Sequence, residues 1–380
     1  MRMLHTSDLH LGKQLHETSL IEDQRYILEQ IVGIAKDEKV EAVLIAGDVY
    51  DRSVGSEEAI RLYSDFLKEL HGNGCKVFII PGNHDSSERV GCLNTILSEE
   101  GIHISGRFDG KMERVQIKDE FGPVNIWLLP FFRMEAFRFP EGTEKSFDNA
   151  FKCILDNSGI DFSGRNVLLS HQFFSSGDEL DVGGSEKEKP SMGGEDCISA
   201  DLLKDFDYVA LGHIHKAQTV GREEVRYSGS PLKYSEKEHH NDKSVVILDV
   251  KEKGNVDIKT VKLRPMRDVR IIEGTVDMLI EAAESAGNTK DYVYVKLTEP
   301  ALDAKQRLSQ VFPNILSIVM SSYDPEDDLE TKSIEEIRSM EPIDLFKELF
   351  LKVKGKEMSE KQIAVFQKAY AEVRRKEVEE

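Results

Sequence analysis

The chain has 380 residues, enough for two to three domains with buried cores. Lys and Arg number 50 and Asp and Glu number 70, which gives a formal net charge of −20, and 39% of the residues are hydrophobic. This composition is typical of a globular protein, and the negative charge argues against a protein that holds DNA alone through a broad basic surface.

Local patterns disfavour two further classes of protein. No run approaches 18 apolar residues, and the first ten residues lack the apolar core of a signal peptide. We therefore expect no membrane span and a cytoplasmic location. The cysteines form no C-x-x-C pair, so free thiols are expected rather than a zinc ribbon or disulfides. They are Cys75, Cys92, Cys153 and Cys197.

Strand and helix signals alternate along the first third of the chain. Short apolar strands are predicted within 2–10, 41–51 and 76–85, and each ends in polar residues. Apolar residues at helical spacing predict helices over 20–38 and 56–71. Strands that are apolar on both faces indicate an α/β sheet covered by helices.

Two later strands, within 166–172 and 207–215, also end in polar residues, and 175–197 is predicted as a long loop. From about 261 the signals change to strand, helix (276–286), strand, helix (301–310) and strand, which is typical of a small α+β module. The predicted organisation is a main domain over 1–260, a small capping domain over 261–322, an acidic linker over 323–332 and a helical tail over 333–380.

The tail carries two apolar stripes at helical spacing. Ordinary packing of these helices on the chain itself is one interpretation. Binding to a partner is the other, and we favour it because the linker separates the tail and the stripes have no obvious partner within the chain. The stripes are Ile343, Phe346, Phe350 and Val353, and Ile363, Phe366, Tyr370 and Val373.

Five short motifs follow predicted strands, and in a parallel sheet all five would meet at one edge. Any one of them is common by chance, but the five together predict a site that binds two divalent metal ions. Imidazole and carboxylate groups favour Mn²⁺, Fe²⁺ or Zn²⁺ over Mg²⁺, and a shared carboxylate can bridge two ions. The motifs are Asp8-Leu9-His10, Gly47-Asp48-Val49-Tyr50-Asp51, Gly82-Asn83-His84-Asp85, Ser170-His171 and Gly212-His213-Ile214-His215.

This set resembles the calcineurin-like metallophosphoesterase superfamily. The phrases HTSDLHLGKQLH, GDVYDR, IPGNHDS, SMGGEDCISADLLKDFDYVALGHIHKAQ and YSGSPLKYS resemble its SbcD family of nuclease subunits. The resemblance is strong over residues 1–240 and extends to the rest by layout only. It implies an α/β sandwich with a small α+β cap and a helical tail.

The resemblance also implies residue roles. One ion would be held by Asp8, His10, Asp48 and His215, and the other by Asp48, Asn83, His171 and His213, with Asp48 as the bridge. His84 would contact the scissile phosphate or protonate the leaving 3′ oxygen.

Four further polar residues in or near the motifs are not among these ligands. Asp85 would orient His84 or cap the next helix, and these alternatives stay open. Asp51 stands where some relatives have His, so it should not be assumed to do the work of an imidazole. His5 and His16 match no ligand position and are expected to be structural.

The implied activity is a DNA nuclease dependent on two Mn²⁺ ions, with Mg²⁺ less favoured, that acts as a 3′–5′ exonuclease on double strands and an endonuclease on single strands and hairpins. The implied partners are DNA, an SbcC-like coiled-coil ATPase bound through 333–380 and a second copy of the chain. ATP would act only through the ATPase. The alternatives are a small-molecule or nucleotide phosphodiesterase with the same site, and a non-catalytic scaffold, which the filled ligand positions disfavour.

Overall fold

The structure is a computed structural model that describes all residues except 178–180, 183–196, 322–341, 355–357 and 380. Residues Met1–Met320 form one compact unit and Ser321–Glu380 form a second. Among the described residues, no helix has the length and apolar character needed to cross a membrane.

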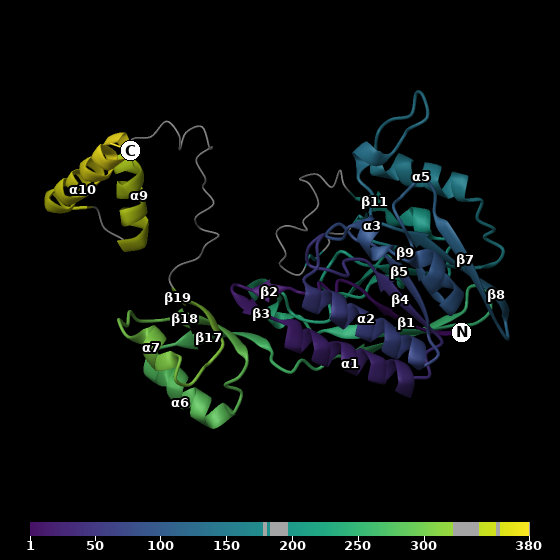
Figure 1. Cartoon of the computed structure of the whole chain (residues 1–380), viewed down its shortest axis with the longest axis horizontal. Coiled ribbons are helices and arrows are strands. Elements are labelled where there is room, and N and C mark those ends of the chain that lie inside the picture. Colours follow the sequence, from purple (N-terminus) through teal and green to yellow (C-terminus); the bar gives the residue numbers. More distant parts are fainter. Residues whose placement is uncertain (178–180, 183–196, 322–341, 355–357, 380) are drawn as a thin grey trace. The chain divides into compact units, whose positions relative to one another are not determined.

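Two six-stranded sheets build the larger part of the first unit (Figure 1). The first sheet contains, in spatial order, β16 (Val256–Lys262), β15 (Ser244–Val250), β1 (Arg2–Thr6), β4 (Ala42–Ala46), β5 (Lys76–Ile80) and β6 (Ile102–Ile104). The second contains β13 (Gln218–Val220), β14 (Arg222–Tyr227), β12 (Tyr208–Leu211), β9 (Arg165–Ser170), β8 (Gly122–Leu129) and β7 (Glu113–Asp119). β1, β4, β5 and β6 are parallel, as are β14, β12, β9 and β8.

The two sheets pack face to face because both faces of their central strands are apolar. Leu44 and Phe78 of the first sheet share a buried cluster with Leu169 of the second. Their neighbours Val43 and Ile79 belong to a different cluster on the outer face of the first sheet. This alternation is the two-residue period of a strand, used here to build two apolar layers.

Helices cover the outer faces of both sheets. α1 (Ile21–Asp37) and α2 (Glu57–Gly72) pack on the first sheet, and α5 (Phe147–Ser158) packs on the second. α2 begins where the Ser56 hydroxyl accepts the N–H of Ala59 at 3.2 Å, a normal N-cap. The predicted α/β sandwich is therefore confirmed, and the predicted helices over 20–38 and 56–71 agree with α1 and α2.

The remaining elements of this part are short. They are β2 (Gln14–Leu15), β3 (Thr18–Ser19), α3 (Ser87–Val90), α4 (Asn94–Leu97), β10 (Phe174–Ser175), β11 (Ile198–Ser199) and 3₁₀ turns at Ser98–Glu100, Met134–Ala136, Ala200–Leu203 and Glu236–His240.

A smaller α+β module follows the second sheet in the chain. It runs β17 (Val269–Gly274), α6 (Val276–Ala286), β18 (Tyr292–Leu297), α7 (Ala304–Leu308) and β19 (Ile315–Met320), with three parallel strands and its own apolar core. The module is tied to α1, because Tyr292 donates to Asp23 at 2.8 Å and Arg267 donates to both carboxylate oxygens of Asp23 at 2.9 and 2.6 Å.

The described part of the second unit contains α9 (Pro342–Lys354) and α10 (Glu360–Glu379), which lie within the segment 333–380 predicted to be helical. The predicted linker lies outside the described residues. The expectation that the apolar stripes lack a partner within the chain is wrong in part. The rings of Phe346 and Phe366 stack with centroids 4.3 Å apart, so the two stripes contact each other at these two residues.

Candidate metal centre

The five motifs meet where the parallel strands of both sheets end. Three of them follow β1, β4 and β5 of the first sheet, and two follow β9 and β12 of the second. The sequence suggested the edge of one sheet. The structure instead places the motifs across the ends of two facing sheets, which lets side chains approach one another from opposite sides.

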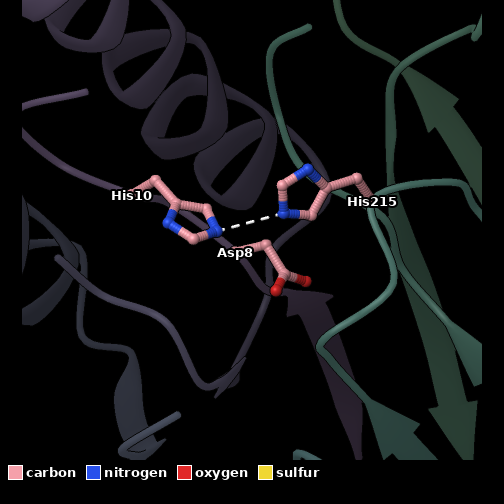
Figure 2. Close-up of side chains that lie close together, drawn as sticks. All are labelled: Asp8, His10 and His215. Carbon is pink, nitrogen blue, oxygen red and sulfur yellow. Dashed lines mark hydrogen bonds between the residues drawn. The ribbon is translucent and has the colours of Figure 1, made fainter. Parts of the chain in front are cut away.

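Asp8, His10 and His215 form the first cluster of potential metal ligands (Figure 2). The Nε2 atoms of His10 and His215 lie 3.0 Å apart. The Asp8 carboxylate accepts the hydroxyl of Ser7 and the backbone N–H of His213, the latter at 3.0 and 3.2 Å. All three ligand residues are buried, so this cluster is held in place and shielded from solvent.

The second cluster contains Asp48, Asn83, His171 and His213. The side-chain oxygen of Asn83 lies 2.9 Å from Nδ1 of His213 and 3.1 Å from Nε2 of His171. Nδ1 of His171 donates to the carbonyl of Ala46 at 2.7 Å. In neutral His171 this bond leaves the lone pair on Nε2, which faces the cluster.

Asp48 lies between the two clusters. Its Oδ2 is 3.5 Å from Nε2 of His10 and 3.3 Å from Nε2 of His171. Its Oδ1 accepts the backbone N–H of His84 at 2.9 Å. This position is the one expected of a carboxylate that bridges two ions.

The backbone of these loops is held in an unusual conformation. φ is positive at Asp8 (53°), His10 (43°), Asp48 (49°) and His213 (94°), none of them glycine. Such residues cost about 1–3 kcal/mol each and gather at functional sites.

Glycines make room for the same loops. A Cβ on Gly82 would lie 2.1 Å from Oδ1 of Asp48, and a Cβ on Gly212 would lie 1.8 Å from the carbonyl oxygen of Ala46. No side chain fits at either position, which explains why glycine precedes the ligands in these motifs.

His84 is half-buried, as is Asn83, whereas Asp48 and the four other site histidines are buried. Its Nδ1 donates to the backbone carbonyl of Asp51 at 2.9 Å, so in the neutral ring Nε2 carries the lone pair. A ring nitrogen of His84 lies within 4.8 Å of ligand atoms of His10 and Asp48.

The structure also gives roles to Asp51 and Asp85. The Asp51 carboxylate accepts from Lys13 at 2.7 Å and lies 3.7 Å from the outer nitrogen Nδ1 of His10. The Asp85 carboxylate accepts three backbone N–H groups at 2.9 Å each, from Val49, Tyr50 and Gly82. Neither alternative suggested for Asp85 describes these contacts, because its carboxylate joins two ligand loops.

Comparison with known proteins places the chain in a family. A family model described as "Calcineurin-like phosphoesterase" matches residues 1–217, and a second, "Type 5 capsule protein repressor C-terminal domain", matches 265–354. A Staphylococcus epidermidis protein named as a subunit of the nuclease SbcCD is 30% identical over 85% of this chain and 86% of its own length. The chain belongs to the calcineurin-like phosphoesterase family.

The chain is also similar to two further proteins. A protein of the same name from Staphylococcus saprophyticus is 28% identical over 88% of this chain and 89% of its own length. A dimetal phosphatase from Danio rerio, known from a crystal structure, is 11% identical with a TM-score of 0.39, covering 70% of this chain and 98% of that one. The named nuclease relatives thus place the chain with the SbcD members of the family.

The calcineurin-like phosphoesterase fold implies a site for two divalent metal ions, and the charges of the buried side chains at this site are suited to binding cations. Burial raises the pKa of Asp8 to about 6, and Asp48 adds to the rise against the opposing effect of His171. Burial would also raise the pKa of Asp48. The nearby His171 ring opposes this effect, and the pKa of Asp48 falls below its usual value. Burial would lower the pKa of His171, yet the Asp48 carboxylate raises it to about 9. Buried carboxylates are stable when paired or when they bind metal ions, and here they face four imidazoles.

Sequence reasoning missed the residues behind the ligands of this phosphoesterase. Oε1 of Glu238 lies 3.2 Å from Nδ1 of His215, and the ring centroids of Phe173 and His213 lie 4.1 Å apart. The YSGSPLKYS phrase precedes Glu238 but gave no role for it. His5 contacts Tyr208 at 2.9 Å and the carbonyl of Leu211 at 3.2 Å, which agrees with the structural role expected for it.

Proposed function

We propose that this phosphoesterase is a Mn²⁺-dependent DNA nuclease, a 3′–5′ exonuclease on double strands and an endonuclease on single strands and hairpins. It would act with an SbcC-like ATPase in double-strand-break repair and recombination. The observation that carries the proposal is the pair of donor clusters sharing Asp48, in a chain whose named relatives over most of its length are nuclease subunits.

The proposed ligand sets are Asp8, His10, Asp48 and His215 for one ion, and Asp48, Asn83, His171 and His213 for the other. When bound, the ions would supply an activated water and neutralise charge on the phosphodiester. The mixture of imidazole and carboxylate donors favours Mn²⁺ over Mg²⁺.

His84 is proposed as the catalytic residue supplied by the chain itself. It is half-buried, unlike Asp48 and the four other histidines of the site, so it is more accessible to a DNA strand than they are. The carbonyl of Asp51 fixes its Nδ1, and the other nitrogen is left to donate to a phosphate oxygen or to protonate the leaving 3′ oxygen when the ring is charged.

The remaining regions suit the same function. We propose that the module within 261–322 is a cap that faces DNA and that residues 333–380 bind the SbcC-like ATPase, through which alone ATP would act. A second copy of the chain would bind through the nuclease domain. Such an activity belongs in the cytoplasm.

One assay separates this proposal from the alternative small-molecule phosphodiesterase. Full-length protein with Mn²⁺ should degrade linear double-stranded DNA and leave a cyclic nucleotide intact. Asp8→Ala, Asp48→Ala and His213→Ala should each abolish the activity while the chain stays folded, because each removes a proposed ligand. His71→Ala, which changes an exposed histidine on α2, is the control and should retain activity.

Two results would count against the proposal. Hydrolysis of the cyclic nucleotide without degradation of DNA would favour the alternative. Near wild-type turnover in any of the three ligand variants would remove that residue from the metal site.

A further inference from the structure

Glu238 is a fully buried carboxylate in the 3₁₀ turn Glu236–His240, directly behind the first donor cluster. Its Oε1 lies 3.2 Å from Nδ1 of His215 and also accepts from the Tyr234 N–H and the Ser235 hydroxyl. Its Oε2 lies 2.6 Å from Nζ of Lys243. These contacts together fix the position of the carboxylate relative to His215 and to the lysine.

Lys243 completes the arrangement. It is also buried, and its Nζ donates to the carbonyl of His215 at 3.0 Å and to the hydroxyl of Ser230 at 2.7 Å. His215 is thus held twice, at its ring by Glu238 and at its backbone by Lys243. A buried ion pair adds little stability on average, because desolvation offsets the attraction, so its presence here needs another reason.

That reason is the direction of the His215 ring. A carboxylate only accepts hydrogen bonds, so Nδ1 of His215 carries the proton and Nε2 presents its lone pair. Nε2 is the atom that lies 3.0 Å from Nε2 of His10 in the first cluster (Figure 2). His171 is held differently, through the backbone carbonyl of Ala46. A carboxylate behind the ring is thus a feature of the first cluster.

We propose that Glu238 is a positioning residue for His215, and that with Lys243 as its counterion it sets the affinity of the first metal site without affecting the second. The inference rests on the proposed metal centre. Removal of such a carboxylate behind a ligating histidine typically weakens metal binding 10–100-fold, because it orients the ring and raises its basicity.

Titration of the metal-free full chain with Mn²⁺ by calorimetry tests the inference, and electron paramagnetic resonance distinguishes a coupled ion pair from a single ion. Glu238→Gln should keep one Mn²⁺ at wild-type affinity and bind the other roughly 10–100-fold more weakly. At subsaturating Mn²⁺ the coupled signal should give way to that of a single ion. The control Glu236→Gln, in the same 3₁₀ turn but partly exposed, should behave as wild type.

A double variant distinguishes a loss of metal affinity from a loss of folding. Glu238→Gln leaves Lys243 buried without its counterion, whereas Glu238→Gln with Lys243→Met removes both charges, a change that proteins often tolerate. The double variant should unfold at the wild-type temperature in EDTA and still show one weakened site.

Wild-type affinity at both sites in either variant would overturn the inference, and so would equal weakening of both sites. A wild-type chain that binds no pair of Mn²⁺ ions would instead overturn the metal centre itself.

Discussion

The Nε2 atoms of His10 and His215 lie 3.0 Å apart, although 205 positions separate the two residues in the chain. Both atoms belong to the buried cluster of potential metal ligands formed by Asp8, His10 and His215. The fold alone therefore brings together donor atoms from distant parts of the chain. Since one residue follows β1 of the first sheet and the other follows β12 of the second, the packing of the two sheets sets this distance.

His84 should be separable from the ligands by experiment. His84→Ser should bind two Mn²⁺ ions and DNA as wild type does but hydrolyse DNA roughly 10²–10⁴-fold more slowly, the usual contribution of a positioned acid or base. Metal content by elemental analysis and single-turnover rates check this, with His71→Ser as the control. Loss of a metal ion along with activity would make His84 a ligand instead.

The pKa of His171 predicts opposite effects of pH on stability and on metal binding. In the metal-free chain its pKa is raised to about 9 by Asp48, despite burial. The ion pair therefore stabilises the fold fully below about pH 6.5, the pKa of an unperturbed histidine, and this contribution is lost as the pH rises through 9. Melting temperatures in EDTA should accordingly fall between these pH values.

Binding of Mn²⁺ must displace the same proton, so the apparent affinity should rise over the same range. Calorimetry at neutral pH in two buffers of different ionisation enthalpy should show proton release on binding. The variant His71→Gln, which removes an exposed histidine on α2, is the control and should release the same number of protons as wild type. An affinity that stays constant from pH 6.5 to 9 would contradict the assignment of His171 as a ligand.

From the sequence, the apolar residues of the helices predicted around 56–70 and 88–100 are the candidates for the surface of the proposed dimer. They are Ile60, Tyr63, Val90, Leu93 and Ile96. In the structure Tyr63 and Val90 are buried, while Ile60, Leu93 and Ile96 are 50%, 63% and 63% exposed, so only these three could form the contact. Ile60→Glu or Leu93→Glu should shift the chain towards monomer in sedimentation at micromolar concentration, because a charge would replace an apolar contact. A wild-type chain that is already monomeric under these conditions would contradict the dimer.

The sequence predicted the strands and glycine-led motifs because both are local. An apolar run followed by Gly and a polar group is visible in residues 42–48 without knowledge of any contact. The roles of Asp85 and Glu238 were not predictable, because each depends on contacts across the fold. Asp85 binds backbone atoms 35 and 36 positions away, and Glu238 reaches a histidine 23 positions away across the turn that follows β14. Backbone donors and buried carboxylates leave no repeating pattern in a sequence.

Deletion of the tail tests partner binding without removing any proposed metal ligand. None of the proposed ligands lies beyond His215, so deletion of 333–380 should leave Mn²⁺-dependent nuclease activity intact. It should abolish binding to an SbcC-like ATPase. Copurification of the partner with the truncated chain, at the stoichiometry seen for the full chain, would return α9 and α10 to a role in self-packing.

Point variants refine this test. Phe346 is a poor choice, because its stacking on Phe366 means that a charge there would disrupt the helix pair itself. Leu351 on α9 and Val365 on α10 are better, since they are 46% and 70% exposed. Burial of such a side chain in an interface is worth about 1.5–3 kcal/mol, so Leu351→Glu and Val365→Glu should each weaken the complex roughly 10-fold or more. Calorimetric titration of the ATPase measures this, with the exposed Lys347→Glu on α9 as the control for a change of charge alone. Weakening by Lys347→Glu as large as that by Leu351→Glu would show that charge, and not the apolar surface, governs the contact.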